Sequence, residues 1–111
     1  MKEFDIIVIG GGMVGLAFAI EFSQKKNCSI AIVEPNTSNP SINKTFHTRV
    51  SAITPSSEAY LKSLNIWDDI KRKQVFVATK VWDQNSHGRL NFHAKDENME
   101  HLGYIIENDL I

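Results

Sequence analysis

The stretch that decides the fold runs from Asp5 to Gly15 and reads DIIVIGGGMVG. Gly10, Gly12 and Gly15 have the G-x-G-x-x-G spacing of dinucleotide-binding turns, which is a weak signal when it stands alone. The preceding residues 4–9 are nearly all apolar, as in a parallel strand that is buried on both faces. A helical pattern follows the glycines, so the turn lies between a strand and a helix, as the motif requires.

The glycines of this turn have separate mechanical roles in a dinucleotide-binding unit. Gly10 permits the tight turn, Gly12 lets the backbone approach a diphosphate, and Gly15 allows the helix to pack closely on the strand. The helix N-terminus offers free N–H groups and partial positive charge to phosphates. We therefore expect the cofactor-binding residues of the turn to be Gly10, Gly11, Gly12, Met13 and Gly15.

A helix and a second strand complete this βαβ unit over residues 1–34. Apolar residues recur at helical spacing in Leu16–Ile20, and Asn27 is a suitable stop for the helix. Ser29–Val33 reads as the second strand, and Glu34 at its end can accept hydrogen bonds from ribose hydroxyls. An acid here disfavours a 2′-phosphate, so we do not expect NADP at this turn. The alternatives are a purely structural glycine turn and a solvated acid at the strand end.

Three further segments follow the βαβ unit. Residues 35–53 read as a long polar loop and a short extended piece that begins with Arg49. Residues 54–73 read as helical, because Thr54 is a good N-cap and a proline follows it. Residues 74–111 read as the start of a β-rich, substrate-side region. The expected buried face of the helix consists of Ala59, Tyr60, Leu61 and Leu64.

Alternating apolar and polar residues predict an antiparallel hairpin in the last segment. Its strands are residues 77–82 and 89–93, joined by the turn residues 85–88. Leu102–Glu107 reads as another strand, with a helix start near Asn108. The predicted fold class is therefore α/β: a Rossmann-like βαβ unit, then a helix and an antiparallel β hairpin.

The composition excludes several classes of function. The 111 residues carry a net charge of −1, and the basic run Lys71–Lys73 reads as solvated surface or as a contact with an anionic membrane, so we expect no nucleic-acid partner. The single Cys28 permits no intrachain disulfide and reads as a buried structural thiol in a reducing compartment. The four histidines lack metal-ligand spacing, so we expect no metal site. The uncharged run 6–20 is too short for a membrane span and lacks the basic leader of a signal peptide.

Several motifs occur together in a specific order. The glycine turn and its acid are followed by Arg49–Ala52 (RVSA), Leu64–Trp67 (LNIW), Val81–Asp83 (VWD) and Gly103–Asn108 (GYIIEN). This series resembles the N-terminal part of the ubiquinone-biosynthesis flavin hydroxylases of the UbiH/UbiF/VisC/Coq6 type, which are relatives of para-hydroxybenzoate hydroxylase. The resemblance spans essentially all 111 residues. The glycine motif occurs in many flavoproteins, whereas RVSA and GYIIEN in combination are far more specific.

The resemblance implies FAD rather than NAD as the bound cofactor. It implies that the glycines contact the FAD diphosphate, that Glu34 contacts the adenosine ribose, and that Arg49 contacts the diphosphate or the flavin side. Arg49 suits this role because a guanidinium binds phosphate oxygens bidentately; a surface arginine at a loop end is the alternative. No catalytic residue is expected in this chain, because in this family the cofactor performs the difficult step.

The implied chemistry is aromatic hydroxylation, with NAD(P)H and O₂ as co-substrates and a polyprenyl phenol of ubiquinone biosynthesis as substrate. The prenyl tail implies access to a membrane or a lipid carrier. We therefore expect a cytoplasmic protein, or one that is peripheral to the inner membrane. Its expected partners are FAD, further copies of itself or other proteins of the ubiquinone pathway.

The chain departs from this family in its length. Relatives run to several hundred residues and carry a later Asp-Gly and a Gly-Asp-Ala segment that complete the FAD site. Neither segment occurs here. We therefore expect a truncated product or an expressed fragment: an incomplete FAD/NAD(P)-binding domain that binds FAD weakly, is inactive alone, and leaves the apolar faces of residues 4–9 and 29–33 without partners. The alternatives are a fragment of another FAD- or NAD-dependent oxidoreductase and a non-catalytic remnant that self-associates.

Overall fold

The computed structural model describes residues 2–36, 42 and 44–111, and it is a mixed α/β structure as expected. Of the predicted loop 35–48, residues 37–41 and 43 lie outside the described residues. The elements, in chain order, are β1 (Ile6–Ile9), α1 (Met13–Lys25), β2 (Ile30–Val33), β3 (Val50–Ile53), α2 (Pro55–Ser63), η1 (Trp67–Asp69), β4 (Gln74–Phe76), β5 (Ala78–Trp82), β6 (Arg89–His93), η2 (Ala94–Glu97), β7 (Gly103–Glu107) and η3 (Asn108–Leu110).

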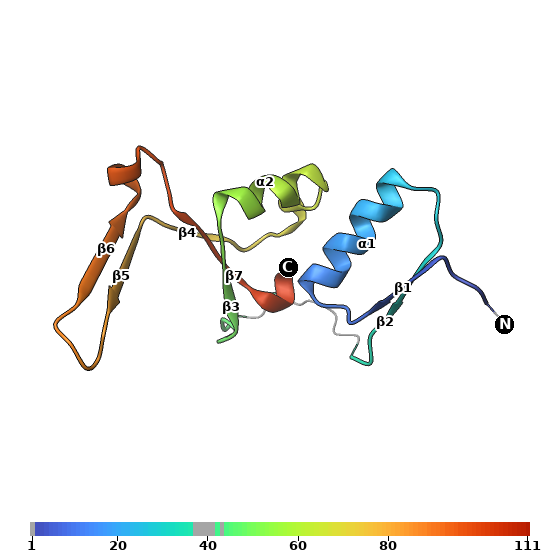
Figure 1. Ribbon diagram of the computed structural model, residues 1–111, viewed down its shortest axis with the longest axis horizontal. Coiled ribbons are helices and arrows are strands. Elements are labelled where there is room, and N and C mark those ends of the chain that lie inside the picture. Colours follow the sequence, from blue (N-terminus) through green and yellow to red (C-terminus); the bar gives the residue numbers. More distant parts are fainter. Residues whose placement is uncertain (1, 37–41, 43) are drawn as a thin grey trace.

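The N-terminal part forms the predicted βαβ unit. β1 and β2 pair in parallel, with Ile6 opposite Ile30 and Ile9 opposite Val33, and α1 connects them (Figure 1). The expectation that β1 is buried on both faces is wrong for this chain: the exposed fractions of Ile7 and Ile9 are 60% and 79%. Helix α1 contacts both strands of this sheet, and Ile32 and Val33 of β2 are also exposed to solvent in the part of the chain that the structure describes.

A second sheet, which the sequence did not predict, forms the middle of the molecule. β7 lies between β3 and β4 and pairs antiparallel with both. The hydrophobic core of this part lies between the sheet, α2 and η1. It consists of Ile53, Leu61, Trp67, Ile70 and Ile106.

Helix α2 begins as predicted, because the side-chain oxygen of Thr54 accepts a hydrogen bond from the N–H of Ser57 at 3.4 Å. Its buried face differs from the prediction. Leu61 and Leu64 are buried, whereas Ala59 and Tyr60 are exposed. Glu58, which the sequence gave no reason to bury, is only 8% exposed.

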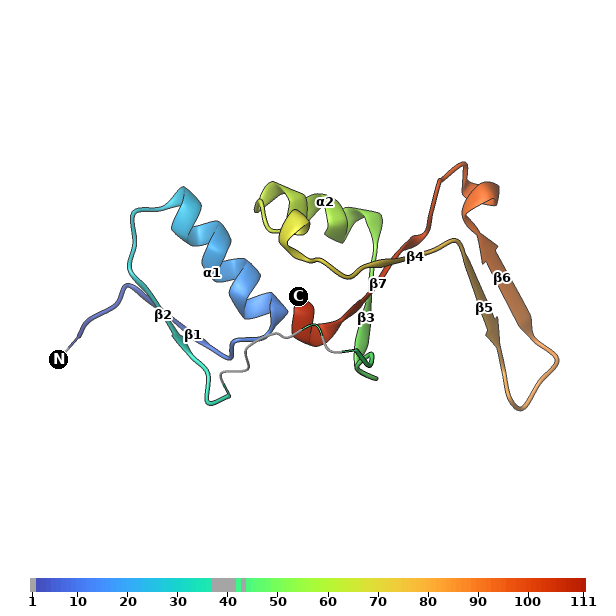
Figure 2. The same cartoon turned by 180° about the vertical axis from the view of Figure 1, so that it is seen from behind.

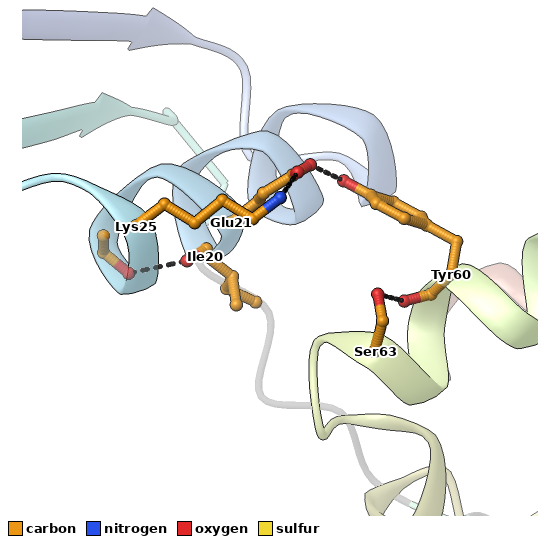
Figure 3. A network of polar contacts seen from close by, with 6 residues as sticks. Ile20, Glu21, Lys25, Tyr60 and Ser63 are labelled. Carbon is orange, nitrogen blue, oxygen red and sulfur yellow. Dashed lines mark hydrogen bonds and ion pairs between the residues drawn. The ribbon is translucent and has the colours of Figure 1, made fainter.

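Tyr60, although exposed, links α2 to α1 (Figure 3). Its hydroxyl donates to Glu21 Oε2 at 2.7 Å, and Lys25 forms an ion pair with the same carboxylate. Nearby, Gln24 Nε2 donates to the Leu64 carbonyl oxygen at 3.2 Å. These polar contacts connect α1 of the βαβ unit to α2 and to its C-cap residue Leu64.

The predicted hairpin forms from β5 and β6 and lies at the end of the molecule opposite the βαβ unit, as both views show (Figures 1 and 2). The molecule is elongated, with principal extents of 61 × 31 × 29 Å. The apolar side chains of the hairpin remain open to solvent: Leu90 is 59% exposed and Phe92 is 48% exposed. Cys28 is half-buried and free, so it is less enclosed than the predicted structural thiol.

Candidate functional site

The glycine turn between β1 and α1 leaves the N-terminus of the helix open. Gly10 has a φ of 99°, a left-handed conformation that glycine adopts without strain, and its N–H donates to the Val33 carbonyl oxygen at 2.9 Å. Gly12 is the N-cap of α1 and provides no side-chain hydrogen bond, and the first turn contains no acidic residue. The positive end of the helix dipole is therefore not neutralised by a side chain of this first turn.

The space around the glycines distinguishes two roles. A Cβ atom at Gly15 would lie 2.5 Å from the Gly10 carbonyl oxygen and 3.1 Å from Val8 Cγ1, so the close packing of α1 on the strand requires glycine there. A Cβ atom at Gly12 would meet no heavy atom of the described residues within 4 Å. Gly12 thus borders open space, which a ligand needs if it is to approach the backbone of the turn.

Glu34 lies directly against this turn. Its Oε2 accepts a hydrogen bond from the Gly11 N–H at 2.7 Å, and its Oε1 accepts one from the Asn36 N–H at 2.8 Å. These two bonds, the first above all, hold the pKa of the Glu34 carboxyl below its ordinary value. The carboxylate is therefore ionised at neutral pH and fixed in position beside the glycines.

Met13 is the first residue of α1 and lines an apolar groove of about 300 Å³ between α1 and α2. The groove is lined by Met13, Val14, Ala17, Phe18, Ile53, Ser57, Tyr60, Leu61 and Ile111. Met13 therefore belongs both to the turn and to the contact between the two halves of the chain. The structure brings together all the predicted site residues of the βαβ unit: Gly10, Gly11, Gly12, Met13, Gly15 and Glu34.

Arg49 lies outside this group, immediately before β3, and is exposed. Its backbone carbonyl oxygen accepts a hydrogen bond from the Asn108 N–H at 3.0 Å. Asn108 also binds the other side of the segment, because its Oδ1 accepts a hydrogen bond from the Ser51 hydroxyl at 2.6 Å. The backbone that carries Arg49 is thus fixed to the end of β7.

A buried carboxylate next to Asn108 strengthens this attachment. Glu107 is 5% exposed, and its Oε1 accepts a hydrogen bond from the His47 backbone N–H at 2.6 Å. Its Oε2 lies 2.6 Å from Arg72 Nε and 2.5 Å from Arg72 Nη2. We call the residues His47, Arg72, Glu107 and Asn108, with these contacts, the Glu107 clip.

In the clip, the negative charge of Glu107 is paired with the positive charge of Arg72. The His47 backbone N–H, and then the Arg72 guanidinium, hold the pKa of Glu107 below its ordinary value, although burial opposes them. The Arg72 guanidinium also lies over the Phe46 ring, at 4.6 Å from its centre. Analysis of the sequence did not identify Glu107, Asn108 or Arg72 as site residues. The available signal was that Glu107 and Asn108 fall within the GYIIEN segment.

Glu58 in α2 is a second buried carboxylate. Glu58 Oε1 is 2.7 Å from Lys62 Nζ, and Glu58 Oε2 is 3.3 Å from His101 Nε2. Lys62 is the main cause of the lowered pKa of Glu58. The contact between Glu58 and His101 joins α2 to the segment before β7. In the part of the chain that the structure describes, Glu58 contacts neither the glycine turn nor Arg49.

The sequence is similar to curated proteins over nearly its whole length. It is 36% identical to the ubiquinone biosynthesis monooxygenase COQ6 of Mus musculus over 118 residues, which cover 97% of this chain and 24% of that protein. The COQ6 proteins of Homo sapiens and Danio rerio are also 36% identical, with the same coverage. The chain is homologous to the N-terminal part of COQ6.

This chain spans about a quarter of the length of the curated relatives it matches. The names of these relatives describe them as ubiquinone biosynthesis monooxygenases and as mitochondrial. No protein-family model matches the chain. The relationship to COQ6 supports the family resemblance, on which the expectation for Arg49 depends.

Neither helix within residues 2–36, 42 and 44–111 is long and apolar enough to cross a membrane. In the same part of the chain, no group of three or more histidine, cysteine, aspartate or glutamate side chains is arranged to hold a metal ion.

Proposed function

We propose that this chain is the FAD-binding N-terminal portion of a flavin-dependent monooxygenase that hydroxylates a polyprenyl phenol in ubiquinone biosynthesis. We further propose that these 111 residues alone do not turn over substrate. The homology to COQ6 supports the class of enzyme. The single structural observation that carries the proposal is the carboxylate of Glu34, held against an open glycine turn by the Gly11 N–H.

The residues of the turn suit the diphosphate of FAD. The open space beside Gly12 leaves room for phosphate oxygens, and the first turn of α1 has no acid to repel them. Backbone N–H groups and the positive end of a helix dipole together favour an anion at this position. Gly10, Gly11, Gly12, Met13 and Gly15 would form this contact.

Glu34 suits the ribose of the adenosine part. An ionised carboxylate has about four lone-pair positions, and two of them on Glu34 are used by Gly11 and Asn36. The remaining positions can accept hydrogen bonds from two neighbouring ribose hydroxyls. The same negative charge would repel a 2′-phosphate, so FAD or NAD suits this site better than NADP.

This assignment gives the cofactor and the chain different roles. Bound FAD would supply the redox chemistry, with NAD(P)H as the reductant of the complete enzyme. The residues of this chain bind and orient it: the turn holds the diphosphate, Glu34 holds the ribose, and Arg49 contacts the diphosphate or the flavin side. A cytoplasmic location, or one peripheral to the inner membrane, stays a prediction for this chain.

Titration with FAD tests the proposal. We expect the chain to quench flavin fluorescence, with ADP competing for the site and FMN, which lacks the adenosine part, failing to bind. The variant Glu34→Gln should weaken FAD binding about tenfold, because it replaces a charged acceptor with a neutral one. The variant Glu3→Gln, at an exposed acid just before β1, is the matched control and should bind like the unchanged chain.

Two outcomes would reject the assignment. If calorimetry on folded protein shows no heat with FAD at any concentration, the glycine turn has only a structural role. If NAD binds in place of FAD, the chain belongs to another class of dinucleotide-dependent oxidoreductase. NADPH oxidation stimulated by a phenol would contradict the proposed inactivity of the 111 residues alone.

A further inference from the structure

The two segments that carry the family resemblance are neighbours in the structure. RVSA begins one residue before β3, and GYIIEN covers β7 and the first residue of η3. The two strands pair antiparallel, with Val50 opposite Glu107 and Ser51 opposite Ile106. The Ser51 and Asn108 side chains, which hydrogen-bond across this pair, are 57 residues apart in sequence. The two motifs therefore form one structural unit.

Within this unit, two hydrogen bonds hold the backbone at and before Arg49. Before it, the His47 N–H donates to Glu107 at 2.6 Å. At Arg49 itself, the carbonyl oxygen accepts from the Asn108 N–H at 3.0 Å. The conformation of residues 47–51 therefore depends on the clip, whereas the side chain of Arg49 remains exposed.

The carboxylate of Glu107 is well suited to hold a backbone segment. It is almost fully buried, and a buried carboxylate needs a partner that compensates its charge. Arg72 provides two N–H donors to one carboxylate oxygen, so the other oxygen is available to the His47 N–H. Outside the buried pair, the His47 ring lies 3.3 Å from the Asp109 carboxylate, which adds an exposed contact to the same segment.

We propose that Glu107, fixed by Arg72, is a positioning residue that holds the backbone of residues 47–51 so that Arg49 meets the anionic part of the bound flavin nucleotide. Glu107 itself does not contact the nucleotide. Its carboxylate acts on the backbone, and its effect on binding passes through the guanidinium of Arg49. This inference rests on the proposed function.

A double-mutant cycle tests this relation. FAD dissociation constants are measured by flavin fluorescence for the unchanged chain, Glu107→Gln, Arg49→Ala and the double variant. We expect Glu107→Gln and Arg49→Ala each to weaken FAD binding about tenfold, since each removes a charge-assisted hydrogen bond or its support. The double variant should bind no more weakly than Arg49→Ala, because the clip has nothing left to position.

Glu58→Gln is the matched control. Glu58 is similarly buried and also ion-paired, but its partners are Lys62 and His101 rather than the Arg49 segment. Its substitution should change the FAD dissociation constant by about twofold at most, as expected for a site without shared partners. Circular dichroism spectra and melting curves of every variant establish that it is folded.

A second variant decides the matter if Glu107→Gln does not fold. Ser51→Ala removes the hydrogen bond to Asn108 and leaves the buried ion pair intact. It should weaken FAD binding about threefold in the unchanged background and have no effect in the Arg49→Ala background.

The outcomes separate the two proposals. No FAD binding by the folded, unchanged chain rejects both the proposed function and the positioning role. The positioning role alone is rejected if Arg49→Ala weakens FAD binding but Glu107→Gln and Ser51→Ala leave it unchanged. Effects of Glu107→Gln and Arg49→Ala that simply add would also reject it, because Glu107 would then act independently of Arg49.

Discussion

At the scale of single residues, two glycines of the same turn differ in the space around them. Gly15 is surrounded by the Gly10 carbonyl oxygen and Val8, whereas Gly12 borders open space and has an ordinary φ of −76°. One glycine is therefore required by the packing of the fold, and the other is available to a ligand. Alanine at each position separates stability from binding.

Gly15→Ala should destabilise the chain by about 1–3 kcal/mol, because its Cβ atom cannot fit against backbone without a shift of α1. Gly12→Ala should cost at most about 1 kcal/mol, as alanine is a poorer N-cap than glycine. Urea unfolding followed by circular dichroism measures both. FAD binding should be lost in Gly12→Ala while that variant remains folded; intact binding would mean that the ligand does not approach the turn there.

Glu107 makes the stability of the fold depend on pH. Its pKa is lowered in the folded state from an ordinary value of 4.5, so its stabilising contribution is complete above about pH 4.5 and is lost as the pH falls through the lowered value. The melting temperature should therefore fall as the pH is lowered from neutrality to below 4.5. Glu107→Gln should show a smaller fall over this range, and melting curves with the same pH dependence in both proteins would contradict the role of the carboxylate.

At the scale of elements, the short turn η1 contributes more to the core than its length suggests. Trp67 within it is 6% exposed, and its ring meets that of Tyr104 edge-on at 5.1 Å between centres. Lys73 Nζ lies 4.9 Å from the centre of the Trp67 ring. The indole thereby joins η1 to β7, and hence to the strand that ends in Glu107.

Trp67→Ala should destabilise the chain by about 3–5 kcal/mol, the usual cost of removing a large buried aromatic ring. Trp82 in β5 is the internal control, since it is 70% exposed and its substitution by alanine should change stability by about 0.5 kcal/mol or less. Urea unfolding measures both variants. Equal effects of the two substitutions would show that the central core is not where stability resides.

The sequence predicted those elements whose rules are local. The βαβ unit follows from fixed glycine spacing, α2 from Thr54 and the proline after it, and the β5–β6 hairpin from alternation around a turn. The β3–β7–β4 sheet was not predicted, because no local pattern specifies which distant strands pair and in which register.

The same limit applies to the candidate site. Met13 and the glycines were found by motif, and Glu34 by its distance from them, and all of these residues do lie together. Glu107 was missed because the burial of a carboxylate depends on a partner, Arg72, which is 35 residues away in sequence. Tyr60 was assigned to the core by helical spacing, yet its hydroxyl is bound to Glu21 on another helix.

At the scale of the whole molecule, the chain is longer and thinner than a compact domain of its size. Its radius of gyration is 17.8 Å, whereas a compact chain of this length has about 13 Å. Two apolar surfaces stay open to solvent at opposite ends: one includes Ile7 and Ile9 on β1, and the other includes Leu90 and Phe92 on β6. Exposed apolar surfaces of this kind favour association.

We therefore expect the chain to self-associate as its concentration rises. Light scattering after size exclusion should give a mass above the 12.5 kDa of one chain. Ile9→Lys and Leu90→Lys should lower the observed mass, since a charge on either surface opposes its burial. A monomer at all concentrations would contradict this expectation and would remove the main argument for the self-associating alternative.

The pairing of β3 with β7 also sets an order of events during synthesis on the ribosome. The strands, helix and acid of residues 5–34 can meet as soon as they emerge, because their contacts are close in sequence. The arginine that follows must wait until Glu107 and Asn108 have been translated, almost sixty residues later, before its backbone is held. A nascent chain stalled before that point would have the glycine turn and Glu34 in place, whereas the backbone that carries Arg49 would not yet be held by Glu107 and Asn108.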